Sequence, residues 1–431
     1  MSAAPTPSAD RIESLDVLRG VALLGILLLN ILGFGLYSIG YFSPLIGLGE
    51  NPQLNLAVWG GVNVLFEGAM RALFSMLFGA GVVMFTTGVG SLSGAGKSGW
   101  LHYKRNFWLL AFGLFDAYVL LWNGDILIVY AICGALLYPL RKLTPRTLMI
   151  LGGVVLVLTS AMYGSLGYYM GLAREASEVV AAAPYLAHDA QTLELDAVWQ
   201  DFIAGFPMDE GAQAGELAQR RGDYATVAAW NAELMNGNLF FVIPVILLWD
   251  ALAMMLFGMA FYRLGILSGE RSRAFYWRLT LAGFAVGLAV NGWEQLQAVR
   301  QDYDLYSTFG YLHGTYHIGR VGIAFGWLGG VMLVCQGGYL TALRQRLAAV
   351  GRMALSNYLM HSLIGLLLFT GVGFGLAGVL ERWMLYPIVF AIWALQLLLS
   401  PWWLDRFRYG PAEWLWRTLT YGSRQRFLAS P

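Results

Sequence analysis

The sequence predicts an all-α integral membrane protein, a polytopic bundle of about ten transmembrane helices with both termini in the cytoplasm. Hydrophobic residues make up 58% of the 431 positions and charged residues only 12%, whereas soluble domains average about 25% charged residues. The mean hydropathy is +0.59. The 16 Trp, 22 Tyr and 24 Phe suit helices edged by aromatic side chains at the membrane surfaces. These observations exclude a water-soluble fold.

Apolar runs begin at Val17, and each is long enough, or nearly so, for a helix to cross about 30 Å of hydrocarbon. The first 16 residues lack the features of a cleaved signal peptide and are expected to stay as a cytoplasmic tail. The third and fourth spans meet at Asn123-Gly124-Asp125, which must form a very short turn. The expected spans are 17–37, 56–85, 107–122, 126–140, 148–170, 239–262, 279–297, 312–340, 353–377 and 384–404.

The distribution of Lys and Arg predicts the orientation, because positively charged loops stay on the cytoplasmic side. With the N-terminus inside, most of the 27 basic residues fall on one side. This pattern predicts a multi-pass protein of the inner (plasma) membrane, with the lipid bilayer as its immediate partner. The basic residues lie in segments 11–19, 97–105, 141–146, 263–278, 344–352 and 406–426.

One long hydrophilic segment, 174–238, interrupts this pattern. We expect it to lie outside the cell and to form a cap of short amphipathic helices, because it contains many aromatic residues. A flexible linker is the alternative. The resulting organisation is a tail (1–16), an N-terminal transmembrane half (17–173), the cap or insert (174–238) and a C-terminal transmembrane half (239–426).

Total charge and cysteine content restrict the partners. The 27 basic and 26 acidic residues give a net charge of +1, which offers no electrostatic basis for binding nucleic acid. Cys133 and Cys335 lie in apolar runs, where a thiol is usually a packing residue. Self-association of the chain into a homo-oligomer stays open.

Polar residues inside apolar spans are costly and usually face a partner or a cavity. Asp16 and Arg19 are one helical turn apart at the start of the first span and can pair there, or simply cap and anchor the helix. Asn30 lies about 16 Å further along the helix, toward the outer half. Glu67 and Arg71 form an i,i+4 pair in the second span, of which a simple ion pair is one interpretation.

Three histidines are candidates for proton transfer. His313 and His317 are four residues apart, on one face at the outer end of the eighth span, with Arg320 one turn deeper. His361 follows Asn357 in the ninth span, near mid-membrane. For each, a hydrogen-bonded structural role is the alternative.

No metal site is predicted, because the His313–His317 pair has no third ligand at a convincing spacing. His102 lies in a basic loop and His188 in the acidic insert, so we expect both to be solvated. Other polar residues are expected to form an outward-facing cavity together with the His pair and Arg320: Glu67, Arg71, Asp125, Asp250, Asn291 and Glu294.

Several strings resemble one bacterial membrane family. The opening RIESLDVLRGVALLGILLLNI is similar to the first helix of the transmembrane acyltransferase superfamily, with its Asp-x-x-Arg-Gly signature. Within that superfamily the chain most resembles the family of domain of unknown function 418. The supporting strings are MRALFSMLFGAGVVMF (70–85), NGDILIVYAICGALLYPLR (123–141), GRMALSNYLMHSLIG (351–365) and AIWALQLLLSPWWLDRFRYGPAEWLWRTLTYG (391–422).

The resemblance implies transfer of an acyl group from a cytoplasmic acyl-CoA or similar donor to an extracytoplasmic glycan or small molecule. No cofactor is expected to be bound permanently. Related heparan sulfate acetyltransferases share the opening signature and an Asn at the place of Asn30. Acyltransferases that modify O-antigen carry a His there instead. Because an Asn side chain cannot accept that proton, the base must come from elsewhere, with His317 or His361 favoured.

Two classes of function therefore stay open. One is a membrane acyltransferase that acts on an envelope or exported glycan or on a small molecule. The other is a transporter or channel for a small polar solute, in which the same charged residues line a pathway. A structural or assembly role is a third interpretation. The chain has no Walker-type phosphate-binding sequence, so it is not predicted to drive transport with ATP by itself.

Overall fold

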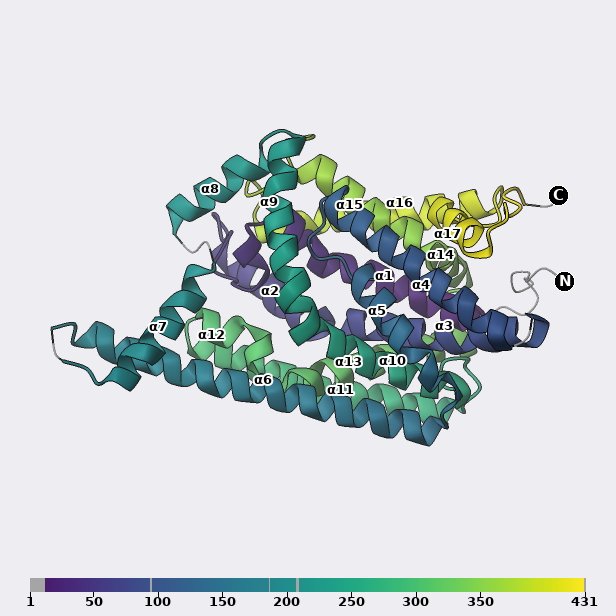
Figure 1. Cartoon of the computed structure of the whole chain (residues 1–431), viewed down its shortest axis with the longest axis horizontal. Coiled ribbons are helices and arrows are strands. Elements are labelled where there is room, and N and C mark those ends of the chain that lie inside the picture. The colour runs from purple at the N-terminus through teal and green to yellow at the C-terminus, as the bar shows by residue number, and fades with distance from the viewer. Residues whose placement is uncertain (1–11, 94, 186, 207–208, 430–431) are drawn as a thin grey trace.

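The computed structural model describes residues 12–93, 95–185, 187–206 and 209–429. These residues form helices joined by loops (Figure 1) and contain no strand, apart from one isolated bridge between Phe407 and Leu428. The predicted all-α class is confirmed. Most of the predicted tail, residues 1–11, lies outside the described residues, and the first helix already begins at Glu13.

The helices run in chain order as α1 (Glu13–Gly35), α2 (Pro52–Phe66), α3 (Ala69–Ser93), α4 (Ala95–Tyr118), α5 (Leu127–Leu137), α6 (Pro145–Ala182), α7 (Ala190–Ala204), α8 (Glu210–Arg220), α9 (Tyr224–Gly237), η4 (Asn238–Leu247), α10 (Leu248–Arg263), α11 (Arg273–Arg300), α12 (Leu305–Thr308), η5 (Gly310–Leu312), α13 (Tyr316–Gln336), α14 (Thr341–Arg352), α15 (Ala354–Phe369), α16 (Leu385–Leu404) and α17 (Pro411–Tyr421). Three further short turns are η2 (Ser38–Tyr41), η3 (Pro139–Lys142) and η6 (Arg382–Met384).

The described residues contain 6 helical stretches long and apolar enough to cross a membrane, so the chain is a membrane protein. Four other predicted spans fall on α4, α5, α11 and α15. α5 and α15 have 11 and 16 residues, fewer than the roughly 20 that a span needs. α4 and α11 contain charged residues such as Arg105 and Glu294. The number ten therefore stays a prediction. The 6 stretches are Glu13–Gly35, Pro52–Thr87, Pro145–Ala182, Tyr224–Arg263, Tyr316–Gln336 and Arg382–Leu404.

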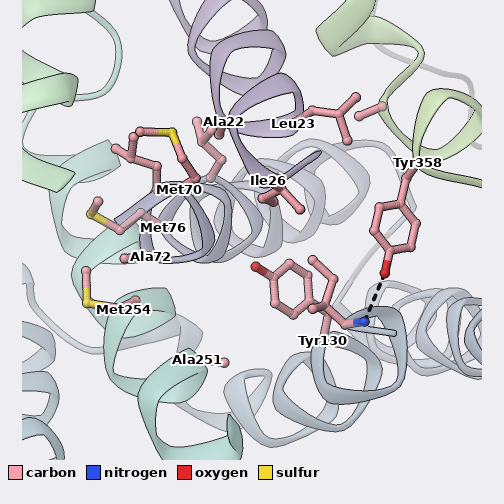
Figure 2. Close-up of a cluster of buried hydrophobic side chains, with 14 of the residues drawn as sticks. Ala22, Leu23, Ile26, Met70, Ala72, Met76, Tyr130, Ala251, Met254 and Tyr358 are labelled. Carbon is pink, nitrogen blue, oxygen red and sulfur yellow. Dashed lines mark hydrogen bonds between the residues drawn. The ribbon is translucent and has the colours of Figure 1, made fainter. Parts of the chain in front are cut away.

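Helix α1 lies in the core of the bundle. It packs against α3, α13, α14, α15 and α16, and nearly all of its side chains are buried. In Figure 2, Ala22 of α1 lies beside Met70 at the start of α3, and Ile26 belongs to the same cluster of buried side chains. A helix that is apolar on every side is expected to be buried in this way.

Glycines allow the closest approaches between helices. Gly79 of α3 lies against the backbone carbonyl of Met255 in α10, and Gly258 of α10 lies against that of Met76 in α3. A methyl group at either glycine would overlap a carbonyl oxygen. Small residues at such crossings are typical of helix pairs in membranes, where dispersion contacts replace the hydrophobic effect. Helices α11 and α13 also pack closely at glycines, which are Gly283, Gly287, Gly322 and Gly326.

This packing predicts that Gly79→Ala lowers the melting temperature of the detergent-solubilised protein. Overpacking a tight contact costs about 1–3 kcal/mol, and here a rigid backbone carbonyl must move. Gly81→Ala is the matched control, because a Cβ at Gly81, two residues further along α3, meets no atom within 4 Å. Equal melting temperatures for the two variants would contradict the assigned crossing.

The hydrophilic segment forms three helices, α7 to α9, after α6 has continued to Ala182. α8 attaches to the end of α1. Arg220 donates to the carbonyl oxygens of Phe34 and Leu36, which α1 leaves without partners. Glu216 accepts from the backbone N–H and the hydroxyl of Ser38, each at 2.9 Å. α7 and α8 lie at the end of the molecule opposite α14 and α17 (Figure 1).

Candidate functional site

A break between α2 and α3 places a charged side chain inside the bundle. Glu67 and Gly68 lie between the two helices. Gly68 has a left-handed backbone with φ of +66°, and a Cβ there would also crowd the side chain of Arg320. Because the helix is interrupted at this point, the predicted i,i+4 pair of Glu67 with Arg71 is wrong. Each residue has another partner.

Arg320, in the second turn of α13, binds two carboxylates. Its Nε donates to Oε2 of Glu67 at 2.9 Å, and its Nη1 donates to Oε2 of Glu294 in α11. Nη1 also lies 3.3 Å from Oδ1 of Asn291. The side chains of Arg320, Glu67 and Glu294 are 7%, 12% and 8% exposed. Removing the guanidinium would therefore leave two buried carboxylates without a counter-charge.

Arg71 forms a second buried pair. Its Nε and Nη2 donate to Oδ2 of Asp250 in α10 at 3.2 and 3.1 Å. Nη2 also donates to the hydroxyl of Tyr316 at 2.9 Å, and that hydroxyl donates to Glu67 at 2.9 Å. Tyr316 thus joins the two ion pairs into one network. We call this network, together with His317, the polar cluster: Glu67, Arg71, Asp250, Asn291, Glu294, Tyr316, His317 and Arg320.

His317 lies between a hydroxyl group and a carboxylate. Its Nδ1 is 3.1 Å from Oγ of Ser160 in α6, and its Nε2 is 3.7 Å from Oδ1 of Asp250. The ring packs on Tyr163, with centroids 4.9 Å apart. His317 is 1% exposed. An imidazole in this position can accept a proton on one side while a carboxylate stabilises the resulting positive charge on the other.

His313 does not share a helix face with His317, so that prediction is wrong. α13 begins only at Tyr316, and His313 has an extended backbone with φ of −109° and ψ of 120°. Its Nε2 lies 3.1 Å from the carbonyl oxygen of Ser307. Regular i,i+4 geometry was assumed across a stretch that is a loop.

Two adjoining cavities border the polar cluster. The larger has a cavity volume of about 30 Å³ and is open in part to solvent, and its walls include Glu67, Arg320 and the aromatic residues Tyr41, Trp59 and Tyr311. The smaller, of about 20 Å³, is lined by Asn291, Glu294 and His313 among others. Arg320 borders both. The structure therefore brings together most of the residues that the sequence assigned to an outer cavity.

Phenolic hydroxyls supply neutral hydrogen-bonding groups at the wall of the larger cavity. Burial raises the pKa of Tyr41 and Tyr311, so both stay protonated at neutral pH. The Arg71 guanidinium approaches the Tyr311 hydroxyl at 3.5 Å. The wall thus combines aromatic surface with hydrogen-bonding groups, which suits a polar ligand.

His361 and Asn357 lie in a separate, closed network between α15 and α16. Nε2 of His361 is 2.8 Å from the side-chain amide nitrogen of Gln396 and 3.1 Å from its oxygen. The Gln396 amide also donates to the Asn357 carbonyl at 3.1 Å, and the Asn357 amide donates to Oγ of Ser400 at 3.1 Å. All four residues are buried, and none of them lines either cavity.

The predicted pair at the start of α1 is present. Nη1 of Arg19 donates to Oδ1 of Asp16 at 2.8 Å, and Asp16 is buried. Arg105 of α4 lies near both Arg19 and Arg417 of α17, so several cations gather at this end. Asn30 is half-buried further along α1.

Asp125 does not join the polar cluster, contrary to the prediction. It lies in the turn before α5, where Tyr358 of α15 approaches one of its carboxyl oxygens at 3.4 Å. Its acidic neighbour is Asp116 of α4. The two aspartates are 2% and 0% exposed. Sequence analysis missed Asp116, although it is the only acidic residue in the predicted span 107–122.

His102 corrects another expectation, because it is buried rather than solvated. α4 extends from Ala95, so His102 lies inside a helix with its Nε2 2.8 Å from the carbonyl oxygen of Gly134 in α5. The Asn106 amide approaches the same nitrogen at 2.8 Å. His188 is half-buried, 2.9 Å from the Ala183 carbonyl oxygen.

Comparison with known proteins places the chain in a family. Residues 261–423 match the model of the family described as "Protein of unknown function (DUF418)". "Uncharacterized protein YxaH" of Bacillus subtilis (strain 168) is 30% identical over 436 residues, which cover 98% of this chain and 97% of the relative. The chain belongs to the DUF418 family.

Two further relatives extend over almost the same length. "Uncharacterized protein YeiB" of Escherichia coli (strain K12) is 29% identical, over 95% of this chain and 96% of the relative. A 39.9 kDa protein encoded in the amylase 3' region of Bacillus acidopullulyticus is 25% identical, over 97% of this chain and 96% of the relative. No solved structure matches the chain significantly.

The sequence did not identify three residues that organise the site: Ser160, Tyr311 and Tyr316. Ser160 is one of several hydroxyl-bearing residues in the long apolar helix α6, and nothing nearby in the sequence links it to His317. The two tyrosines were visible in the string YLHGTYHIGR, where aromatic residues at a membrane surface are ordinary. Their hydroxyl contacts with Arg71 appear only in three dimensions.

Proposed function

We propose that this DUF418 protein is a membrane-bound acyltransferase that moves an acyl group from an acyl-CoA or similar donor to a glycan or small-molecule acceptor. The position of His317 carries the proposal. Its imidazole lies 3.1 Å from a hydroxyl oxygen and 3.7 Å from a carboxylate oxygen, within a buried cluster beside two cavities. Acyl transfer to a hydroxyl or amine requires removal of a proton, and imidazole suits that task near neutral pH.

The Ser160 hydroxyl marks a place where an oxygen atom fits within hydrogen-bonding distance of His317 Nδ1. An acceptor hydroxyl or amine that replaces the Ser160 hydroxyl in this contact attacks the carbonyl carbon of the thioester donor. Its proton passes to His317 and then to the departing thiolate, so the reaction needs no further reactant. Asp250 stabilises the positive charge on the imidazole between these two steps. Tyr316 contacts the His317 ring, with centroids 5.3 Å apart, and also lines the larger cavity, so in this proposal the acceptor approaches from that side.

The opposite end of the bundle suits an anionic donor. Asp16 holds the Arg19 guanidinium at 2.8 Å, and Arg105 and Arg417 add positive charge nearby. Guanidinium groups bind phosphate oxygens strongly, often through two parallel hydrogen bonds. In this proposal the donor phosphates bind at the start of α1, and the acyl group reaches the polar cluster within the bundle.

The proposed orientation places both termini in the cytoplasm and α7 to α9 outside, in the inner (plasma) membrane. The clustering of Lys and Arg supports it, as does the location of α14 and α17 at the end opposite α8 (Figure 1). Introduced cysteines at exposed positions test this orientation. In a chain with Cys133 and Cys335 replaced by Ser, Ala212→Cys should react with an impermeant thiol reagent on intact cells. Ser423→Cys should react only after permeabilisation, and the reverse pattern would overturn the orientation.

Acyl transfer is tested with purified protein in lipid nanodiscs and acetyl-CoA labelled on the acetyl group. Amino sugars and envelope glycan fragments serve as acceptors, and hydrolysis without an acceptor is measured in parallel. Label transfer, or hydrolysis above a His317→Gln control, supports the enzyme. Absence of both, with every class of acceptor, would reject it.

One feature favours the alternative function, a transporter for a small polar solute. Two of the long apolar stretches are interrupted next to charged residues. The first breaks at Glu67 and Gly68, and the second contains the π-helical η4 with Pro244, just before Asp250. Interrupted helices that line a polar site are typical of transporters. Solute uptake into vesicles without acyl turnover would favour this function.

A further inference from the structure

Two buried carboxyl groups lie together outside the polar cluster. Asp116 belongs to the last turn of α4, and Asp125 to the turn that precedes α5. The Asp116 carboxyl faces both the Asp125 carboxyl and the hydroxyl of Ser362 in α15. The two aspartates are 0% and 2% exposed, and Ser362 is 1% exposed. Neither aspartate lines either cavity, so this pair plays no part in the proposed acyl transfer.

The two carboxyl groups have different hydrogen-bond donors. Oδ2 of Asp125 accepts from the backbone N–H of Ile128 at 2.9 Å, and the Tyr358 hydroxyl approaches its Oδ1 at 3.4 Å. Figure 2 shows Tyr358 directed toward this turn, where it also accepts from the backbone N–H of Ile126 at 3.2 Å. Within the described part of the chain neither oxygen of Asp116 has a hydrogen bond of regular geometry, and the neighbouring donor that faces it is the Ser362 hydroxyl.

Among the residues that the structure describes, no cation forms an ion pair with either aspartate. Tyr358 is the ionisable side chain that α15 presents to the pair. α9 contributes the Asn231 amide, which donates to the Ala117 carbonyl at 2.7 Å. α1 contributes Phe34, whose ring packs on Trp122 of the turn. Two negative charges this close, in a low dielectric and without a cation, repel strongly.

We propose that Asp116 and Asp125 form a proton-binding site in which Asp116 carries the proton. The proton supplies a donor between the two carboxyl groups, so that the Asp116 carboxylic acid donates to the Asp125 carboxylate. Asp125 keeps the negative charge, because backbone N–H groups at the start of α5 stabilise it there. The site binds or releases one proton, and no other reactant is involved.

The proton-binding site lies next to the contact between α9 and the α4–α5 connection. α9 holds the α4–α5 connection through hydrogen bonds to three backbone carbonyls. Tyr224 donates to Val119 at 2.9 Å, Asn231 to Ala117 at 2.7 Å and the adjoining Asn238 to Asn123 at 3.0 Å. Loss of the proton leaves both Asp116 and Asp125 negatively charged, next to this connection. The resulting repulsion separates the end of α4 from the start of α5 and weakens the attachment of α9.

Infrared difference spectroscopy of the full-length protein in nanodiscs tests the proposal directly. At neutral pH the wild type should show the C=O stretching band of a protonated carboxylic acid, and Asp116→Asn should lose that band. Asp201→Asn is the matched control, because Asp201 is exposed on α7, and it should keep the band. A wild type without the band, or a band that persists unchanged in Asp116→Asn, would overturn the proposal.

Stability as a function of pH provides a second measurement, independent of any activity. An Asn at position 116 has nearly the shape of a protonated Asp and cannot ionise. The wild type should lose melting temperature as the pH is raised and the pair gives up its proton, whereas Asp116→Asn should lose clearly less over the same range. Superimposable pH profiles for the two proteins would likewise overturn the proposal. Failure of the acyl-transfer assay would leave both readouts unaffected.

Discussion

His317→Gln should lower the rate of acyl transfer by about a hundred- to ten-thousand-fold, the usual worth of a positioned general base. A Gln amide can keep a hydrogen bond to Ser160 but cannot accept a proton at neutral pH. Its volume is close to that of His, so the buried site should stay filled and the protein folded. The measurement is turnover of labelled acetyl-CoA in nanodiscs, with size-exclusion profile and melting temperature recorded for the same preparation.

The control for this prediction is His361→Gln. His361 is 2% exposed and bonds to Gln396 of the neighbouring helix, so its replacement should lower the melting temperature more than the rate per folded molecule. Full activity in His317→Gln together with lost activity in a folded His361→Gln would identify His361 of α15 as the general base. Normal activity in both variants would remove histidine from the mechanism.

Arg320→Ala should destabilise the protein by about 3–5 kcal/mol, the cost of removing one partner from a buried ionic network. Glu67 and Glu294 would both lose their counter-charge, with side chains only 12% and 8% exposed. Thermal unfolding in detergent is the measurement. Adding Glu67→Gln and Glu294→Gln to Arg320→Ala should restore part of the loss, because the remaining groups are then neutral.

Arg174→Ala is the matched control for the arginine network. Arg174 also binds two carboxylates, Glu178 at 3.1 Å and Asp304 at 2.7 Å, but its side chain is 29% exposed and that of Glu178 is 64% exposed. Water screens such pairs, and their loss usually costs less than about 1 kcal/mol. A comparable loss of stability in Arg174→Ala and Arg320→Ala would show that burial does not set the strength of the Arg320 network.

Local patterns predicted the features that depend on neighbouring residues in the chain. The i,i+3 spacing of Asp16 and Arg19 predicted their contact, because consecutive turns of one helix bring such residues together. The same rule failed for Glu67 with Arg71 and for His313 with His317. In both cases the rule assumed a continuous helix, whereas Gly68 interrupts one and the other starts only at Tyr316.

The chain by itself determined that this is an all-helical membrane protein, because composition and the length of apolar runs decide whether a segment prefers lipid to water. It also indicated which polar residues lie in the apolar part. Tertiary structure alone decided their partners. Arg320 meets Glu67 and His317 meets Ser160 across helices that are distant in sequence, and Asp116 meets Asp125 across the turn between α4 and α5. In membranes, helix crossings depend on local packing, such as that of Gly79 against a backbone carbonyl, and periodicity carries no information about such contacts.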